Sequence, residues 1–224
     1  MSQIIEVNGV SKRFKKRTLM KDVNITVNEG STIGLVGENG SGKSVLYKMI
    51  VGLIEPDTGE VIVRGKRIGR DVDFPSNTGA LINDPGYIAP YSGFKNLKYL
   101  AEINQIIDDE KIRDTLKRVG LDPEDKTKVK DYSSGMKKKL GIAQAIMENQ
   151  DIIILDEPFN ALDAKSVVNI RQVIKELQTE GKTILLTSHN HEDIEMLCND
   201  VYIILDQEVV EFDEKIKEMY FSHQ

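Results

Sequence analysis

The chain has 224 residues, a formal net charge of −6, a single cysteine and no tryptophan. At about 150 residues per domain, this length predicts one large domain or two fused lobes. A content of 40% hydrophobic and 29% charged residues is typical of a globular protein and excludes a disordered one. The acidic net charge argues against a general nucleic-acid binder, and the single cysteine, Cys198, fits a reducing compartment.

The sequence shows no sign of export or of membrane insertion. The N-terminal residues lack the basic stretch and apolar run of a secretory signal. The longest apolar runs, such as 152–155, fall far short of the ~20 residues that cross a bilayer. We therefore expect a cytoplasmic protein without membrane spans of its own.

The N-terminal part of the chain predicts strands around one helix. Apolar residues alternate with polar ones over 23–27, the pattern of a half-buried strand. The apolar run 32–36 predicts a second strand that ends at a glycine-rich loop. Residues 43–53 carry apolar side chains at helical spacing, a turn is expected at 56–59, and 61–63 is strand-like.

The middle of the chain changes to helical patterns, and strand–helix alternation then returns. Helices are predicted over 97–107 and 112–119, with an exposed, lysine-rich connection at 122–131. Further strands are expected at 152–155, 183–187 and 201–205, and further helices at 164–180 and 191–198. This alternation implies a parallel sheet with helices on both faces.

These patterns predict a single α/β domain over 1–224. The core is expected at about 1–90 and 150–224, and a helical subdomain is expected to interrupt it at about 91–149.

Residues 37–44, Gly-Glu-Asn-Gly-Ser-Gly-Lys-Ser, match the whole P-loop pattern between a predicted strand and a predicted helix. Glycines let successive backbone N–H groups point into one concavity, and the helix N-terminus adds positive potential. Lys43 is then placed to reach the β- and γ-phosphates of a nucleotide, and Ser44 to bind Mg²⁺. A glycine-rich turn without function is the disfavoured alternative. The residues expected to bind the phosphates are Gly37, Asn39, Gly40, Ser41, Gly42, Lys43, Ser44 and Val45.

The apolar run 152–155 ends in two carboxylates, Asp156 and Glu157. A buried parallel strand delivers its C-terminal residues to the ligand-binding edge of a sheet. Asp156 is expected to hold Mg²⁺, directly or through water. Glu157 points elsewhere by strand alternation and is expected to orient or deprotonate an attacking water. Acidic residues after a strand often only cap the next helix, but the P-loop favours the catalytic interpretation.

With three further motifs in the same order, the chain resembles the ATP-binding subunit of ABC transporters over nearly its whole length. Residues 131–136 resemble the family's signature loop, 161–163 its D-loop, and 187–189 its switch histidine. The resemblance implies the ABC ATPase fold: a P-loop NTPase parallel-sheet core with an N-terminal antiparallel β subdomain and a helical insertion. Residues 81–85, Tyr91 and the signature loop are most similar to the bacitracin and lantibiotic export and immunity branch.

The resemblance also implies roles for residues outside the P-loop. Phe14 sits where the family stacks an aromatic ring on adenine, and His189 where a histidine contacts the γ-phosphate. Ser133 and Gly135 would reach the nucleotide of an opposite subunit, and Asp163 belongs to the D-loop. The implied cofactors are ATP and Mg²⁺.

The implied assembly is an ATP-dependent homo- or heterodimer of such subunits, peripheral on the inner face of the cell membrane through a transmembrane permease. The permease is expected to dock near 83–100, and no nucleic acid is expected as a partner. Hydrolysis of ATP to ADP and phosphate would power transport, with export as the expected direction.

The sequence departs from the family pattern at four positions. The signature loop has Tyr132 for leucine, Ser134 for glycine and Met136 for glutamine, while Ser133 and Gly135 remain. Asn83 stands where the family has glutamine or, in some branches, glutamate. Because asparagine is one methylene shorter, we expect a weakened or water-bridged contact of Asn83 with Mg²⁺ and retained ATPase activity.

Two groups of cations remain open. The lysines at 137–139 follow the signature loop and are either a solvated helix face or part of the phosphate field. Cations are unfavourable near a helix N-terminus unless an anion is present, which favours the second interpretation. The cations at 12–17 around Phe14 are either exposed turn residues or a basic hairpin beside a triphosphate.

Two rival functions come from other classes. An ATP-gated regulatory or nucleic-acid-processing ABC protein usually carries a long coiled-coil insert or two cassettes in one chain, and neither pattern is present in this sequence. A nonhydrolytic binding module conflicts with the joint presence of Asp156, Glu157 and His189.

Overall fold

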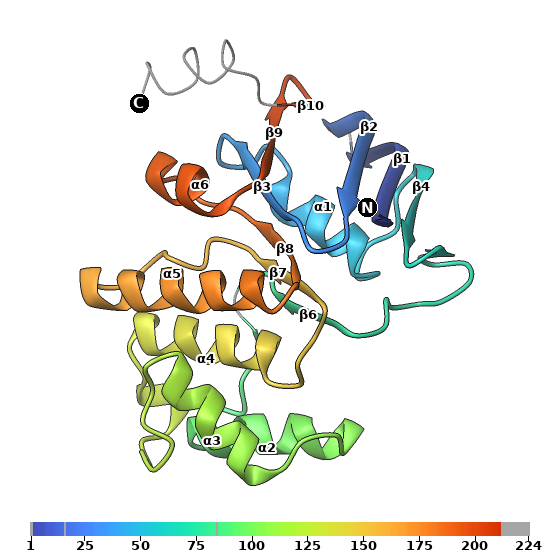
Figure 1. Ribbon diagram of the computed structural model, residues 1–224. Helices are drawn as coiled ribbons and strands as arrows, with labels where there is room; N and C mark the ends of the chain where they lie inside the picture. The colour runs from blue at the N-terminus through green and yellow to red at the C-terminus, as the bar shows by residue number, and fades with distance from the viewer. Residues whose placement is uncertain (1, 16, 84, 212–224) are drawn as a thin grey trace.

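The computed structural model describes residues 2–15, 17–83 and 85–211. Met1, Lys16, Asp84 and the end of the expected core range, 212–224, lie outside the described residues. In Figure 1 the N-terminal strands lie on one side, a larger sheet crosses the middle, and three helices form a lobe at the bottom. Among the described residues, no helix is both long and apolar enough to cross a membrane.

The described strands are β1 (Gln3–Phe14), β2 (Arg17–Asn28), β3 (Thr32–Gly37), β4 (Thr58–Val63), β5 (Lys66–Arg67), β6 (Thr78–Leu81), β7 (Ile152–Leu155), β8 (Thr183–Leu186), β9 (Asp200–Leu205) and β10 (Glu208–Glu211). The helices are α1 (Lys43–Ile50), α2 (Gly93–Asn104), α3 (Asp109–Arg118), α4 (Ser134–Ile146), α5 (Ala164–Thr179) and α6 (His191–Leu197), with a 3₁₀ turn at Val129–Asp131.

The N-terminal strands form an antiparallel sheet in the order β2-β1-β4-β5. The alternating residues of β2 behave as expected, because Val23 and Val27 are fully buried and the polar residues between them are exposed. This sheet confirms the expected antiparallel β subdomain.

The second sheet has the order β10-β9-β3-β8-β7-β6, in which β10 is antiparallel to its neighbour and the other neighbouring strands run parallel. Strands β3, β7 and β8 are buried throughout, as parallel strands covered on both faces are. The carboxyl ends of these three adjacent strands lead into 37–44, 156–157 and 187–189, so that the sheet gathers the predicted motifs at one edge. The α/β fold class is confirmed.

Strand β7 shows how the two faces of this sheet are covered. Ile152 and Ile154 pack in a cluster with α1 and the N-terminal sheet, whereas Ile153 and Leu155 pack in a cluster with α4 and α5. Because successive side chains of a strand point to opposite faces, the run of four apolar residues serves both layers.

The backbone of strand β6 packs directly against the backbone of α4, with no side chain between them at Gly79. A Cβ atom on Gly79 would come within 1.8 Å of the backbone oxygen of Ala145, a distance that only glycine avoids. The edge strand that leads toward Asn83 is therefore fixed directly on the helix that follows the signature loop.

Two helices end earlier than their apolar patterns predict. The first, α1, ends at Ile50, because Gly52 takes a φ of 82° and turns the chain, which leaves Leu53 60% exposed. The helix expected over 97–107 ends at Asn104, because Gln105 has a φ of 56°. Strands β6 and β10 were not predicted, and the connection expected to be exposed buries Val129 as part of the helical lobe.

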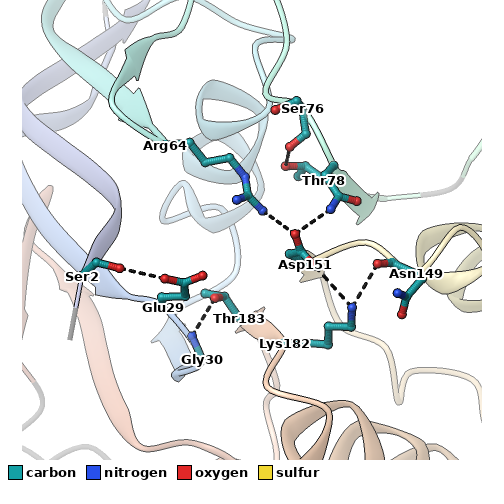
Figure 2. A network of polar contacts seen from close by, with 11 residues as sticks. Ser2, Glu29, Gly30, Arg64, Ser76, Thr78, Asn149, Asp151, Lys182 and Thr183 are labelled. Carbon is teal, nitrogen blue, oxygen red and sulfur yellow. Dashed lines mark hydrogen bonds and ion pairs between the residues drawn. The ribbon is translucent and has the colours of Figure 1, made fainter.

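At the edge of the sheet opposite to the motifs, the carboxylate of Asp151 joins three segments of the chain. Asp151 Oδ2 accepts hydrogen bonds from Arg64 at 2.9 Å and from Asn77 at 2.6 Å, and Oδ1 lies 3.3 Å from Lys182 Nζ. Lys182 Nζ also donates to the backbone oxygen of Asn149 at 3.0 Å. Figure 2 shows Arg64 and Lys182 reaching Asp151 from different sides.

Candidate functional site

The P-loop has a backbone that only glycine accommodates at two points. Gly37 ends β3 with a φ of 147°, and a Cβ atom there would lie 2.9 Å from Ser41 Oγ. Gly42 precedes α1 with a φ of 118°, and its Cβ atom would lie 2.5 Å from the terminal methyl of Met20. The loop can therefore curl tightly against β2 before α1 begins at Lys43.

A hollow of about 260 Å³ lies over this loop. One wall consists of the P-loop residues Asn39, Gly40, Gly42, Lys43, Ser44 and Val45. The rest of the lining consists of Asp156, Glu157, Asn160, His189 and Leu19 of β2. The structure thus brings together most of the residues that the sequence assigns to phosphate, metal and water.

Lys43 is held under the loop by two backbone oxygens. Its Nζ donates to the oxygen of Gly37 at 2.6 Å and to that of Glu38 at 3.1 Å. Burial lowers the pKa of Lys43, and the negative charges of Glu157 and Asp156 oppose this effect. The ammonium group is therefore a buried cation that already faces the two carboxylates of the site.

Asp156 is 4% exposed and accepts hydrogen bonds from two hydroxyl groups. Ser44 Oγ donates to Asp156 Oδ2 at 2.6 Å, and Thr187 Oγ1 donates to Asp156 Oδ1 at 2.9 Å. A hydroxyl and a carboxylate side by side are the hard oxygen ligands that Mg²⁺ uses beside nucleotide phosphates, so these residues fit the ion. Among the described residues, no cluster of three or more His, Cys, Asp or Glu could hold a metal.

Thr187 was not assigned a role from the sequence. Its Oγ1 accepts a hydrogen bond from the backbone N–H of Glu157 at 2.7 Å while it donates to Asp156. Thr187 follows β8, which lies beside β7 in the sheet. A hydroxyl one residue beyond the neighbouring strand was the only signal for this role, and it requires the strand order to be known.

Glu157 and His189 lie next to each other in the lining of the hollow. His189 Nε2 lies 3.0 Å from Glu157 Oε1. Glu157 takes a φ of 51° directly after the strand and, like Asp156, lines the hollow. Burial raises the pKa of Glu157, and the charges of His189 and Lys43 oppose this effect. A carboxylate with a raised pKa beside a histidine is suited to accept a proton.

Gly37 and Ser41 of the P-loop do not line this hollow, and Phe14 and Asn83, expected from outside the P-loop, do not line it either. Phe14 ends β1, is 46% exposed and carries Lys12 Nζ at 5.6 Å from its ring centroid. Asn83 is exposed two residues beyond β6, with a φ of 56°. Neither residue lines the hollow over the P-loop, so their contacts with nucleotide or metal stay predictions.

The signature loop and the D-loop lie beside each other rather than in this chain's own hollow. Ser133 caps α4 by accepting a hydrogen bond from the N–H of Met136 at 3.2 Å, and Asp163 caps α5 in the same way from Ser166 at 2.8 Å. A Cβ atom on Gly135 would lie 2.9 Å from the backbone oxygen of Ala161. The two loops therefore form one continuous surface.

Tyr132, which stands where the family's signature loop has leucine, fits because it packs against a glycine, Gly93. Its side chain is buried at 7% exposure, and its hydroxyl accepts a hydrogen bond from the N–H of Gly93 at 3.3 Å. A Cβ atom at Gly93 would come within 2.7 Å of that hydroxyl. The larger ring thus anchors the start of α2.

The lysines after the signature loop act on the carboxylates of the same chain. Burial is the largest influence on the pKa of Glu157, and the charge of Lys138 is among those that lower it. The pKa of Asp163 is lowered chiefly by its bonds to Ser166, with a further contribution from Lys139. Both observations favour the interpretation in which these cations contribute to the field of the site.

Comparison with known proteins agrees with this geometry. Residues 20–160 match the family model described as ABC transporter. An uncharacterized ABC transporter ATP-binding protein of Bacillus subtilis, YybJ, is 39% identical over 95% of this chain and 97% of its own length. The bacitracin transport ATP-binding protein BcrA of Enterococcus faecalis is 33% identical over 94% of this chain and 69% of its own.

Further relatives extend the comparison. The lantibiotic transport ATP-binding protein SrtF of Streptococcus pyogenes is 30% identical over 97% of this chain and 96% of its own length. A solved ATP-binding subunit of an ABC transporter superimposes with a TM-score of 0.85 at 24% identity, covering 98% of this chain and 93% of that chain. A dimeric bacterial ABC transporter cassette superimposes with a TM-score of 0.82 at 25% identity, covering 92% of this chain and 96% of that chain. The chain therefore belongs to the ABC transporter family, as an ATP-binding subunit.

Proposed function

We propose that the chain is an Mg²⁺-dependent ATPase whose hydrolysis of ATP to ADP and phosphate powers export by a separate transmembrane subunit. The observation that carries the proposal is the hollow over the P-loop. It brings a buried lysine, a serine–aspartate pair and a glutamate–histidine pair within one space of about 260 Å³. These are the parts that phosphoryl transfer needs for positioning and for charge stabilisation.

Lys43 and the P-loop amides would hold the phosphates. The ammonium group of Lys43 now donates to two loop oxygens, and the phosphate oxygens of ATP would take their place as acceptors. Because Lys43 is buried, its charge is weakly screened and acts strongly on the transferred phosphoryl group.

Ser44 and Asp156 would hold the metal ion through the oxygens that now hydrogen-bond to each other. When bound, Mg²⁺ neutralises the charge that develops between the β- and γ-phosphates. Thr187 keeps the Asp156 carboxylate turned toward Ser44 by occupying its other oxygen.

Glu157 would orient the attacking water and accept its proton. The proton passes from the water to the carboxylate as the oxygen bonds to the γ-phosphorus and the bond to the leaving ADP oxygen breaks. His189 lies 3.0 Å from the same carboxylate and would hydrogen-bond the γ-phosphate. The raised pKa of Glu157 makes it a better proton acceptor than an exposed glutamate.

The chain would act as a dimer, with Ser133 and Gly135 of one subunit facing the nucleotide of the other. Two observations support this assembly. The signature loop and D-loop form one continuous surface away from the chain's own hollow, and a similar cassette is dimeric in its solved structure. ATP binding would close the dimer and hydrolysis would open it, as a ligand-driven shift between two states.

The transmembrane subunit would dock on the face of α2, near 83–100, and hold the chain at the inner face of the cell membrane. Tyr91 and Tyr99 stack there with ring centroids 5.4 Å apart, and Lys95 Nζ lies 3.9 Å from the centroid of Tyr91. Tyr99 is 40% exposed, so this aromatic surface is open to a partner. The relatives named for bacitracin and lantibiotic transport suggest a peptide antibiotic as cargo.

The regulatory or nucleic-acid-processing alternative receives no support from the helical lobe. Its helices α2, α3 and α4 have 12, 10 and 13 residues, far shorter than a coiled-coil insert. The acidic net charge of −6 also disfavours a nucleic-acid partner.

The central test replaces Glu157 with glutamine. Glu157→Gln keeps the shape of the side chain but cannot accept the proton, so ATP turnover should fall at least about 100-fold. The variant should also accumulate as an ATP-bound dimer in size-exclusion chromatography. Glu110→Gln, an exposed glutamate in the first turn of α3, is the matched control and should keep the native rate. A native rate in Glu157→Gln would refute the assigned role.

Docking is tested by co-purification from membranes. The unaltered chain should bring down a polytopic membrane protein, and Tyr99→Ala should weaken this association while its ATPase activity in solution remains. Recovery of no membrane protein by the unaltered chain under conditions that preserve such complexes would contradict the transport function.

A further inference from the structure

The carboxylate of Asp193 is buried beneath the loop that carries His189. Asp193 lies on α6 and is 2% exposed. Its Oδ1 lies 2.7 Å from Arg171 Nε, which donates to it, and 2.6 Å from the terminal nitrogen of the same guanidinium. Its Oδ2 accepts a hydrogen bond from Ser188 Oγ at 2.8 Å. Both oxygens are thus bonded, as a buried ionised carboxylate requires.

Ser188 connects this carboxylate to the catalytic loop. Its Oγ also accepts a hydrogen bond from the N–H of Asn190 at 3.1 Å, and the residue is 7% exposed. Ser188 thereby fixes the backbone on both sides of His189. The preceding residue, Thr187, is bound to Asp156 and to the N–H of Glu157. The loop is therefore attached to β7 at one end and to Asp193 at the other.

Arg171 makes two ion pairs, and they have different consequences. The pair with Glu192 at 2.8 Å joins α5 to α6 at the surface, where the Glu192 side chain is 65% exposed. That contact alone would serve to fasten the two helices. The pair with Asp193 is buried and continues through Ser188 to the loop, which fastening of the helices does not require.

We propose that Arg171, Asp193 and Ser188 are positioning residues that hold His189 against Glu157. The inference deepens the proposed ATPase function and rests on it for its effect on turnover. The physical reason is that a histidine on a loop loses its catalytic geometry with a displacement of about 1 Å, which costs up to about 100-fold in rate. The contacts from Arg171 through Asp193 to Ser188 oppose this displacement, because a movement of the loop would take the Ser188 hydrogen bond from Oδ2 of the buried Asp193 carboxylate, whose Oδ1 is held by Arg171.

The contacts among Arg171, Asp193 and Ser188 also connect the His189 loop to the D-loop, because Arg171 lies on α5 and Asp163 of the D-loop caps the same helix. Asp163 caps the first turn of α5, and Arg171 lies further along that helix. A movement of α5 at either end would therefore displace Arg171, and with it Asp193 and the loop that carries His189.

The kinetic experiment compares Ser188→Ala, Asp193→Asn and Arg171→Met with Arg118→Met. Arg118 is the matched control, because it also pairs with Glu176 of α5 at 3.2 Å and with Glu180 directly after α5 at 2.8 Å, whereas among the described residues it makes no ion pair with the loop. We expect kcat to fall about 10-fold in the first three variants with KM for ATP unchanged, and the control to keep both values. In a His189→Ala background the same three substitutions should cause no further loss, because their effect passes through His189.

A second measurement reports the position of His189 without ATP. In histidine-labelled protein, the ring ¹H–¹³C signal that His189→Ala removes should shift or broaden in Ser188→Ala and stay in place in Arg118→Met. Ser188→Ala deletes a single hydroxyl, so it remains informative if Asp193→Asn or Arg171→Met does not fold.

Three results would overturn the inference: native kcat in the folded variants, losses that add to that of His189→Ala, or an unmoved His189 signal in Ser188→Ala. These results differ from a failure of the proposed function. If the unaltered chain, purified as a dimer with Mg²⁺, hydrolyses no ATP, the ATPase is refuted, while the His189 signal still decides whether the loop is positioned by Ser188.

Discussion

Asp151 and Asp156 flank the same buried strand, β7, yet their surroundings differ in kind. Asp151 is bonded to Arg64, Asn77 and Lys182 and its side chain is 46% exposed. Asp156 is buried and accepts hydrogen bonds from two hydroxyl groups. A carboxylate already neutralised by two cations has little left for a metal ion, whereas one bonded to hydroxyls keeps its full charge.

Each edge of the sheet also has a buried lysine, and the lysines differ in the same sense. Lys182 is fixed by Asp151 and by the backbone oxygen of Asn149. Among the described residues, Lys43 Nζ is hydrogen-bonded to backbone oxygens of its own loop alone, and a phosphate can replace them. The comparison teaches that Asp156 and Lys43 at the working edge are bonded to uncharged groups, which a metal ion or a phosphate can replace, whereas Asp151 and Lys182 at the opposite edge are paired with each other.

The largest effect expected from this comparison is on turnover in Asp156→Asn. Loss of the charge should lower ATPase activity at least about 100-fold, because the metal ion loses its ionised ligand. The introduced amide would still accept one hydroxyl hydrogen bond, so the urea midpoint should change little. Asp151→Asn, at the other end of the strand, should keep the native turnover. Equal losses in the two variants would break the distinction between the edges.

The next effect is on ATP affinity, with the two lysines as a matched pair. Lys43→Met should weaken ATP binding at least about 10-fold, because a charge-assisted contact with phosphate contributes about 1.5–3 kcal/mol. Lys182→Met should leave ATP binding unchanged, as measured by titration calorimetry or a fluorescent nucleotide. A comparable loss of affinity in Lys182→Met would show that the opposite edge also contributes to the nucleotide site.

A smaller effect is expected on stability in Asp151→Ala. Removal of the carboxylate leaves the buried Lys182 with only a backbone acceptor and frees Arg64 and Asn77. The cost should be about 2 kcal/mol in the free energy of unfolding, below the value for a fully buried pair because Asp151 is partly exposed. Urea denaturation measures it, and unchanged stability would mean that the network in Figure 2 contributes nothing.

The smallest effect is a pH dependence at the working edge. Burial raises the pKa of Glu157 in the folded chain, so ionisation of Glu157 opposes folding once the pH exceeds the usual value of about 4.3. Glu157→Gln should therefore raise the urea midpoint of ligand-free protein at pH 7. The gain should vanish as the pH falls well below about 4.3, where Glu157 is protonated in both states. A gain that persists at the lower pH would have another cause.

The motifs at the working edge could be predicted because each follows a strand with a strong local pattern. The runs 32–36 and 152–155 place the P-loop, Asp156 and Glu157 without knowledge of the strand order. Thr187 could not be assigned a role from the sequence. Its hydrogen bonds with Asp156 and with the N–H of Glu157 depend on β8 lying beside β7, which the sequence does not reveal. Asp151 is the same case at the other edge, with partners from segments far along the chain.

Element ends were harder to predict than elements. The helix expected to reach residue 107 ends at Asn104 because a glutamine takes a left-handed backbone conformation, which no propensity signals. Strand β6 has only four residues and includes Gly79, so it shows no apolar alternation, and its position is fixed by the close approach to α4. The local sequence pattern thus predicts where the site lies, whereas tertiary packing decides where the surrounding helices and strands begin and end.

The contact between Tyr132 and Gly93 has a consequence for how this sequence can vary. Because a Cβ atom at position 93 would lie 2.7 Å from the tyrosine hydroxyl, any other residue at position 93 would force the ring of Tyr132 to shift and would disturb its hydrogen bond with the backbone there. A chain with leucine at 132 has no such hydroxyl and is free of that restriction. Although the two positions lie 39 residues apart, a larger residue at position 93 should therefore cost less stability beside leucine than beside tyrosine at position 132.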